Sequence, residues 1–196
     1  MLKKMAVFIS RNGADLQCII DACADHQISG SVDFVVSSSR DAIGLKRASN
    51  AGISSIFFDQ AKYDSKDLFY QEIGKRLRSR EIDWILLIEY GDLLPDWLID
   101  EFSGQIVCCH PSLVPEFFGK EEAGLMMADR VRAEGGLVTG CTIFEVRSGQ
   151  EDFGKIIAQD SVPVFDSDSV GHLYNRVKKL EHYLLPRTIS DLCAND

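Results

Sequence analysis

The sequence lacks the features that mark membrane-spanning, secreted and nucleic-acid-binding proteins. None of its apolar runs approaches the roughly eighteen residues of a membrane span. Residues 1–4 precede a short apolar run that ends at Arg11 and is too brief for a secretory signal. No basic run is present, and the formal net charge is -9, which argues against general affinity for nucleic acid or anionic membrane. We therefore expect a cytoplasmic protein with neither nucleic acid nor membrane as a partner.

The cysteines also lack the spacing of a disulfide framework or a structural zinc site. Six are present, none in a C-x-x-C pair, and we expect most of them to be buried thiols. A zinc site built from Cys108, His110 and Cys141 is not expected either, because residues on adjacent strands rarely give tetrahedral spacing. We predict no metal.

Internal repeats, low-complexity tracts and linkers are absent, so we expect residues 1–196 to form a single domain. Short apolar runs alternate with segments whose apolar residues recur at helical spacing. The predicted strands cover residues 5–10, 34–36, 53–58, 83–88 and 105–109, and the predicted helices between them cover 14–23, 42–51, 66–80 and 97–102. This alternation predicts an α/β fold with a doubly wound, mostly parallel sheet.

The C-terminal third departs from that alternation. Residues 138–146 and 155–164 read as two strands in succession, after a predicted helix over 123–133. They predict an antiparallel hairpin at the edge of the sheet. A long helix should follow, capped by Asp166 or Ser167 and bent or broken near its end by Pro186.

The stretch of residues 105–119 is the one most suggestive of a site. Its apolar half stops at His110, and Pro111 ends the strand because proline has no N–H for the ladder. Strand alternation places Cys108 and His110 on one face and Cys109 on the other. Ligands of open α/β sheets bind at the carboxyl ends of strands. A histidine here beside small thiols is by itself typical of a core position, and a catalytic role requires a partner such as Asp152.

A second candidate site follows the first strand. Gly13, Ala14 and Asp15 form a glycine turn into a helix, whose exposed N–H groups and dipole favour an anion such as phosphate. One glycine in such a place is more often only a turn, and the Asp15 carboxylate would repel an anion.

Five motifs in order resemble those of the phosphoribosylglycinamide formyltransferase family. They are residues 10–17 (SRNGADLQ), 109–115 (CHPSLVP), 138–143 (VTGCTI), 152–159 (DFGKIIAQ) with 162–164 (VPV), and 176–182 (RVKKLEH). The resemblance implies a Rossmann-like formyltransferase fold. It also implies transfer of a formyl group from 10-formyltetrahydrofolate, as co-substrate, to the amine of glycinamide ribonucleotide in purine biosynthesis.

The resemblance also implies roles for particular residues. His110 and Asp152 match the catalytic pair, in which the carboxylate raises the histidine pKa so that the imidazole can carry a proton. Cys108 occupies the position of a catalytic, folate-contacting asparagine. The residues matching the acceptor site are Gly13, Ala14, Asp15 and Glu181, and those matching the folate site are Lys66, Gly91, Asp92, Leu93, Leu94 and Cys108.

The chain departs from the family pattern at ligand-facing positions. Cys108 replaces an amide with a weak S–H donor, and loss of one oxyanion donor typically costs about 2.7–4 kcal/mol. Phe144 and Ala123 replace histidines, and Asp15 replaces an asparagine. Three alternatives therefore stand beside the transferase: a formyltetrahydrofolate hydrolase, an enzyme with a Cys108 nucleophile, and a non-catalytic homologue. We expect a monomer or a homodimer.

Overall fold

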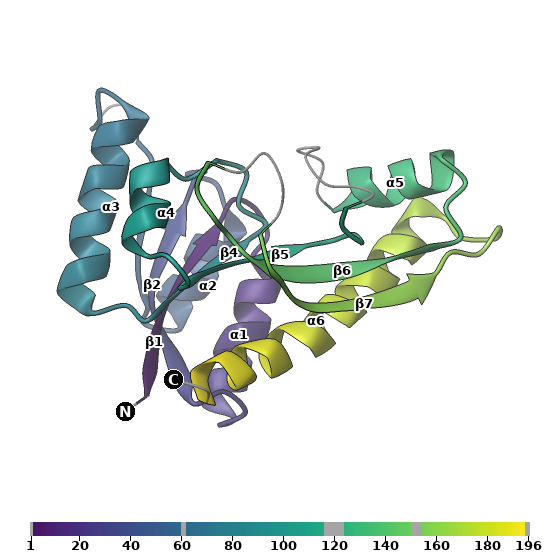
Figure 1. The fold of residues 1–196 in the computed structure, drawn as a ribbon, viewed down its shortest axis with the longest axis horizontal. Helices are drawn as coiled ribbons and strands as arrows, with labels where there is room; N and C mark the ends of the chain where they lie inside the picture. The colour runs from purple at the N-terminus through teal and green to yellow at the C-terminus, as the bar shows by residue number, and fades with distance from the viewer. Residues whose placement is uncertain (1, 60–61, 116–123, 150–153, 195–196) are drawn as a thin grey trace.

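A computed structural model describes residues 2–59, 62–115, 124–149 and 154–194. Seven strands form one sheet in the order β3-β2-β1-β4-β5-β6-β7 (Figure 1). The strands are β1 Lys3–Ile9, β2 Gly30–Ser37, β3 Ser54–Phe57, β4 Trp84–Ile88, β5 Ile106–His110, β6 Val138–Glu145 and β7 Ile156–Pro163. The helices are α1 Ala14–Ala24, α2 Ile43–Asn50, α3 Lys66–Arg80, α4 Asp96–Glu101, α5 Leu125–Ala133 and α6 Val170–Ala194.

The pairing of the strands confirms the predicted doubly wound sheet. Strands β1 to β5 pair in parallel, whereas β6 pairs antiparallel with both β5 and β7. The late hairpin is therefore antiparallel and forms the sheet edge, as predicted. Because β1, β4 and β5 are adjacent and parallel, the residues that follow them meet at one edge of the sheet.

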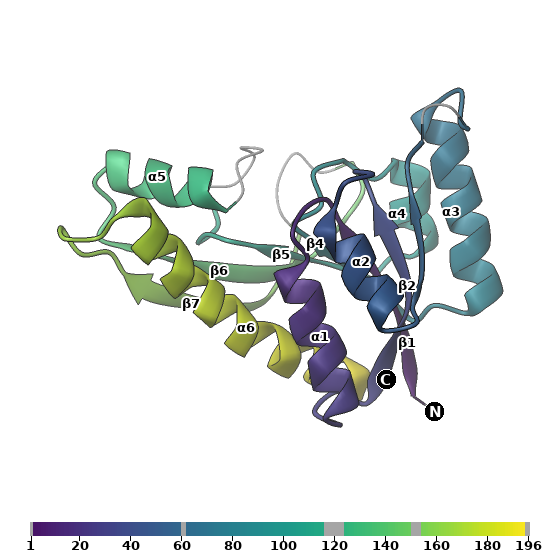
Figure 2. The ribbon, with the colours of Figure 1, turned by 180° about the vertical axis from the view of Figure 1, so that it is seen from behind.

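Helices cover both faces of the sheet (Figures 1 and 2). Helices α1, α2 and α6 enclose one apolar core, and α3 and α4 enclose a second core on the other face. Adjacent residues of β1 alternate between them, so that Val7 packs in the first core and Phe8 in the second. The central strands are buried on both sides, as their continuous apolar sequences predict.

Helix α6 departs from the prediction at both ends. Its first turn is capped by Ser169, whose Oγ accepts a hydrogen bond of 3.1 Å from the amide of His172, so the predicted cap at Asp166 or Ser167 is wrong. The sequence predicts a bend or a break at Pro186; the helix continues through Pro186 to Ala194, so a break is wrong. Proline cannot donate to the carbonyl of His182, and the thiol of Cys18 donates to that carbonyl instead, at 3.6 Å.

The course of α6 carries polar side chains to the ligand edge. This helix packs against α1, α5, β6 and β7 and runs along the length of the hairpin (Figure 2). Its middle turns therefore lie beside the N-terminus of α1 and the carboxyl ends of the central strands. None of the helices in the described ranges is long and apolar enough to cross a membrane.

Candidate active site

His110 lies at the end of β5, in the position that its sequence context predicts. Its Nδ1 is 2.8 Å from Oγ of the buried Ser112. Cys108 precedes it on the same face of the strand and pairs across the ladder with Phe144. Burial lowers the pKa of His110 to about 4, so the surroundings described here favour a neutral imidazole at pH 7.

A hydrogen-bond network anchors the loop that follows His110. The hydroxyl of the buried Thr142 donates to the carbonyl of Ser112 at 2.7 Å and accepts from the amide of Val114 at 3.3 Å. The Gln159 amide donates to the same hydroxyl at 2.9 Å and to the carbonyl of Val114 at 3.1 Å. Strands β6 and β7 thus hold the loop in place. Sequence reasoning missed this role, although Thr142 and Gln159 both lie within the recognised motifs.

We expect Thr142→Val to destabilise the protein by about 1–3 kcal/mol, because it leaves the buried partners of one hydroxyl unsatisfied. Urea unfolding measures this loss. The matched control is Thr188→Val: Thr188 is also buried, and its hydroxyl donates to the carbonyl of Leu184 within α6. The control should cost less than about 1 kcal/mol. Equal losses in the two variants would show that the Thr142 network does not hold the loop.

The surroundings of Cys108 argue against a thiolate nucleophile. Burial raises the pKa of its thiol to about 12, whereas a reactive cysteine requires a lowered pKa. Cys109 lies on the opposite face of β5, in the core beneath α6, as the strand alternation predicts. No disulfide joins the six cysteines, all of which lie in the described ranges; three are buried and three half-buried. Of the three alternatives to the transferase, the Cys108 nucleophile is therefore the least favoured.

The predicted anion-binding turn between β1 and α1 has the required geometry. Gly13 precedes the helix with a φ of 68°, in the left-handed region, and a Cβ there would lie 2.6 Å from Cα of Gly44. A side chain at this position is therefore excluded by both conformation and space. The turn leaves the first amides of α1 at the carboxyl end of β1, where an anionic group can approach.

An ion-pair cluster centred on Lys178 joins this turn to α6. Lys178 Nζ lies 2.8 Å from the carboxylate of Asp15, 2.5 Å from that of Glu89 and 2.7 Å from that of Glu181. His182 Nε2 lies 3.0 Å from the other oxygen of Asp15. The structure thus brings together two predicted acceptor-site residues, Asp15 and Glu181, through a lysine to which the sequence reasoning assigned no role. The sequence does contain a signal for this pair: Lys178 lies three residues before Glu181, a spacing that places both side chains on one face of a helix.

The charged groups in this cluster shift one another's pKa values. Three surrounding carboxylates raise the pKa of Lys178 despite its burial. Burial alone would raise the pKa of Asp15, but the hydrogen bond from His182 and the charge of Lys178 hold it below its usual value. Burial and the neighbouring Asp15 raise the pKa of Glu181 to about 7. With three acids and one lysine, Glu181 is the carboxyl group that takes up a proton most readily.

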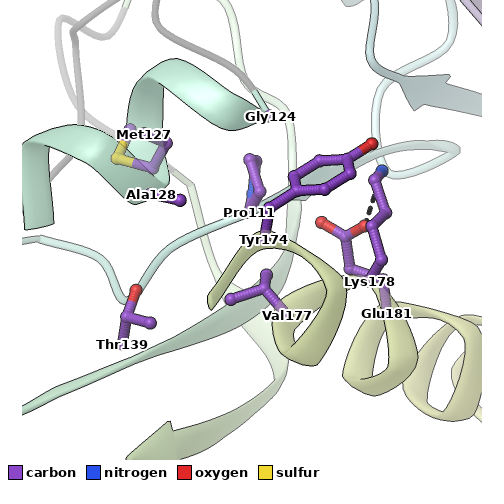
Figure 3. Close-up of a pocket in the computed structure, with 9 residues that line it drawn as sticks. All are labelled: Pro111, Gly124, Met127, Ala128, Thr139, Tyr174, Val177, Lys178 and Glu181. Carbon is purple, nitrogen blue, oxygen red and sulfur yellow. Dashed lines mark ion pairs between the residues drawn. The ribbon is translucent and has the colours of Figure 1, made fainter. Parts of the chain in front are cut away.

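A small cavity is bordered both by the residue after His110 and by the ion-pair cluster centred on Lys178. Its volume is about 10 Å³, and its lining includes Pro111, Thr139, Tyr174, Lys178 and Glu181. Figure 3 shows Tyr174 from α6 beside Lys178 and Glu181, whose ion pair is drawn as a dashed line. The residue after His110 and the acid of α6 therefore border the same space.

The predicted folate-side residues lie near one another on a different part of the edge. Lys66 at the start of α3 pairs with Asp92 at 2.6 Å, and the amide of Gly91 donates to Oγ of Ser10 at 2.7 Å. Leu94 is buried in the core, whereas Leu93 is exposed. The loop after β4 is thus fixed at three points and presents one apolar side chain to solvent. Asp152 and Ala123 lie outside the described residues, so the approach of Asp152 to His110 stays a prediction.

A mostly parallel sheet with helices on both faces makes this molecule a doubly wound α/β protein, and its candidate site residues follow the carboxyl ends of adjacent strands. A family model for formyl transferases matches residues 3–189. Phosphoribosylglycinamide formyltransferase of Bacillus subtilis is 32% identical over 97% of this chain and 95% of its own length. The chain therefore belongs to the phosphoribosylglycinamide formyltransferase family.

Other relatives agree with that assignment. The chloroplastic phosphoribosylglycinamide formyltransferase of Vigna unguiculata is 36% identical over 97% of this chain, and the chain spans 61% of that relative's length. The crystal structure of glycinamide ribonucleotide transformylase 1 from Geobacillus kaustophilus superposes with a TM-score of 0.91. It is 33% identical, and the match covers 98% of this chain and 100% of that one. The fold predicted from the resemblance is confirmed.

Proposed function

We propose that this protein transfers the formyl group of 10-formyltetrahydrofolate to the amine of glycinamide ribonucleotide. The observation that carries the proposal is the shared cavity between Pro111 and Glu181. The residue after His110 and the Glu181 carboxyl group both border this cavity, which supports a shared site for the formyl donor and the amine. Relatives with this function match almost the whole chain.

In this proposal, the acceptor lies between the α1 turn and α6. The amides that follow Gly13 bind its phosphate. Glu181 binds the glycinamide end. The Asp15 carboxylate is turned toward Lys178 and His182, so its charge is neutralised by their cations rather than directed at the phosphate. The acid at position 15 is therefore compatible with an anionic substrate.

The folate binds on the other side of His110, along the loop of Gly91, Asp92, Leu93 and Leu94. The amine attacks the formyl carbon, its electron pair forms the new C–N bond, and the carbonyl electrons move to oxygen. The His110 imidazolium stabilises the resulting oxyanion. When the oxyanion collapses and the bond from the formyl carbon to the folate nitrogen breaks, His110 donates its proton to that nitrogen, and the neutral imidazole then takes up the proton of the attacking amine. Asp152 supplies the charge that favours the imidazolium. Cys108 offers this oxyanion only a weak S–H donor, so we expect a slow enzyme.

Separate calorimetric titrations with glycinamide ribonucleotide and with a non-hydrolysable folate analogue test the two halves of the site. We expect both ligands to bind, each with one equivalent. Glu181→Gln should weaken the ribonucleotide and leave the folate analogue unaffected, which makes the analogue an internal control for folding. Binding of the folate alone would favour a hydrolase, and binding of neither would favour a non-catalytic homologue.

A further inference from the structure

A cluster of metal-ligating side chains lies on the opposite face of β5 from His110. Cys109 on β5, Cys141 on β6 and Glu181 on α6 each place one ligand atom within 4.8 Å of the other two. The sulfur atoms of the two cysteines are 3.5 Å apart. We propose that these three residues form a binding site for a thiophilic divalent cation, Zn²⁺. This inference goes beyond the proposed function.

The spacing of the ligand atoms suits tetrahedral zinc. With Zn–S bonds of about 2.3 Å, two thiolates of one tetrahedral site lie roughly 3.8 Å apart. The thiols of Cys109 and Cys141 therefore need to separate by only a few tenths of an ångström. The pairing across the ladder explains their closeness, because Cys109 pairs with Ile143 and Cys141 lies two residues away on the same face.

The third ligand is buried beside the two thiols. Glu181 is 2% exposed, and its Oε2 lies 2.7 Å from Lys178 Nζ. A carboxylate has two oxygens, so one can ligate a cation while the other keeps the ion pair with Lys178. Cys109 and Cys141 are 8% and 0% exposed, so the site is shielded from competing water.

A bound cation also offsets most of the charge of its ligands. Two thiolates and one carboxylate carry three negative charges, of which Zn²⁺ neutralises two. Binding displaces the two thiol protons to solvent. Zinc prefers four ligands in a tetrahedron, so three protein ligands leave one position for an exogenous ligand such as water.

The shared residue Glu181 predicts a competition, which rests on the proposed function. A carboxylate bound to zinc is withdrawn from the acceptor cavity, so Zn²⁺ and glycinamide ribonucleotide should weaken each other's binding by the same factor. Zinc would then be an inhibitor of the protein rather than a participant in its reaction.

The test is direct metal binding to the reduced, metal-free protein, which does not depend on turnover. Zn²⁺ is titrated in competition with a chromophoric chelator, and Co²⁺ is used in parallel as a spectroscopic probe of thiolate ligation. We expect one equivalent to bind, with thiolate-to-cobalt charge-transfer absorption. X-ray absorption of the wild-type zinc complex should show two sulfur ligands at about 2.3 Å, with the remaining ligands being oxygen at about 2.0 Å.

Single substitutions assign the ligands. Substitution of a residue that only supports a metal ligand commonly lowers metal affinity by about 10–100-fold. Cys109→Ala and Cys141→Ala each remove a ligand itself, so each should lower the affinity at least that much. The matched control is Cys23→Ala, which removes a half-buried thiol from α1 and should leave the affinity unchanged. Where a core variant fails to fold, the absorption spectrum of the wild type still tests the ligand set.

Three results would overturn the site. They are the absence of stoichiometric zinc binding, wild-type affinity in both Cys109→Ala and Cys141→Ala, and a zinc shell without two sulfurs. Failure of the proposed function is distinguishable from these, because it would abolish the mutual weakening by glycinamide ribonucleotide while leaving one equivalent of zinc bound through sulfur.

Discussion

Replacing His110 with alanine is expected to lower kcat/KM for formyl transfer by about 10²–10⁴-fold. The substitution removes both the proton carrier and a group that stabilises the oxyanion, and general acid–base catalysis typically contributes a factor of that size. Steady-state kinetics with both substrates measures the loss. Alanine is small and uncharged and can pack at this position of β5. We therefore expect the His110→Ala variant to keep binding the folate analogue.

The pH dependence identifies how His110 acts. Burial alone holds its pKa near 4, below the ordinary value of about 6.5, so the imidazolium would make up only about one part in a thousand at pH 7. Since the reaction needs the protonated form, activity must fall as pH rises through the operative pKa. We expect Asp152 to raise that pKa in the wild type, and Asp152→Asn to shift the alkaline limb of kcat/KM toward acid pH.

Two results would contradict this role of His110. A His110→Ala enzyme within threefold of the wild type would remove the histidine from the mechanism. An unchanged pH profile in Asp152→Asn would remove the carboxylate as the group that raises its pKa. Ser112→Ala is the companion variant, because it deletes the hydroxyl 2.8 Å from Nδ1 without changing the charge near the ring.

Replacing Cys108 with asparagine is expected to increase formyl transfer by up to about a hundredfold. The position shares a face with His110, and a carboxamide there adds the positioned donor that the thiol lacks. In other enzymes, loss of one such donor lowers kcat by about 10²–10³-fold. This factor sets an upper limit on the gain expected here. The rate of formylated product formation at saturating substrate is the quantity to compare.

Cys108→Ala is the control, since it removes the thiol without adding a donor and should leave the slow rate nearly unchanged. Loss of all turnover in both variants would instead point to a cysteine nucleophile. In a hydrolase, Cys108→Asn should shift the products from formate toward formylated amine. A rate unchanged in Cys108→Asn would show that the missing donor does not limit this protein.

The fold could be predicted from the sequence because its elements are specified locally. Helix α3 has the bounds that its apolar spacing predicts, and the Ser65 hydroxyl caps it by accepting a hydrogen bond from the amide of Leu68. The predictions for α6 failed at both of its ends. Several polar residues before α6 could cap it, and the residue that does so is Ser169. The helix passes Pro186 because the thiol of Cys18, from α1, satisfies the carbonyl that proline leaves free.

The candidate site was predictable only in part, for similar reasons. His110 could be placed at the sheet edge because Pro111 ends the strand after it. Lys178 could not be assigned, since a lysine in an amphipathic helix ordinarily faces solvent. It is buried here because acids from three separate segments, Asp15, Glu89 and Glu181, surround it. The thiol pair of Cys109 and Cys141 likewise depends on the pairing of β5 with β6.

The central claim is that one protein carries a formyl group from folate to an amine, and product analysis tests it most directly. The wild-type protein is incubated with 10-formyltetrahydrofolate and glycinamide ribonucleotide, and both products are quantified by mass spectrometry. We predict tetrahydrofolate and formylated ribonucleotide in equal amounts, and we expect both to form about 10²–10⁴-fold more slowly when His110 is replaced by alanine. Tetrahydrofolate accompanied by formate and no formylated ribonucleotide, or no tetrahydrofolate at all, would contradict the account.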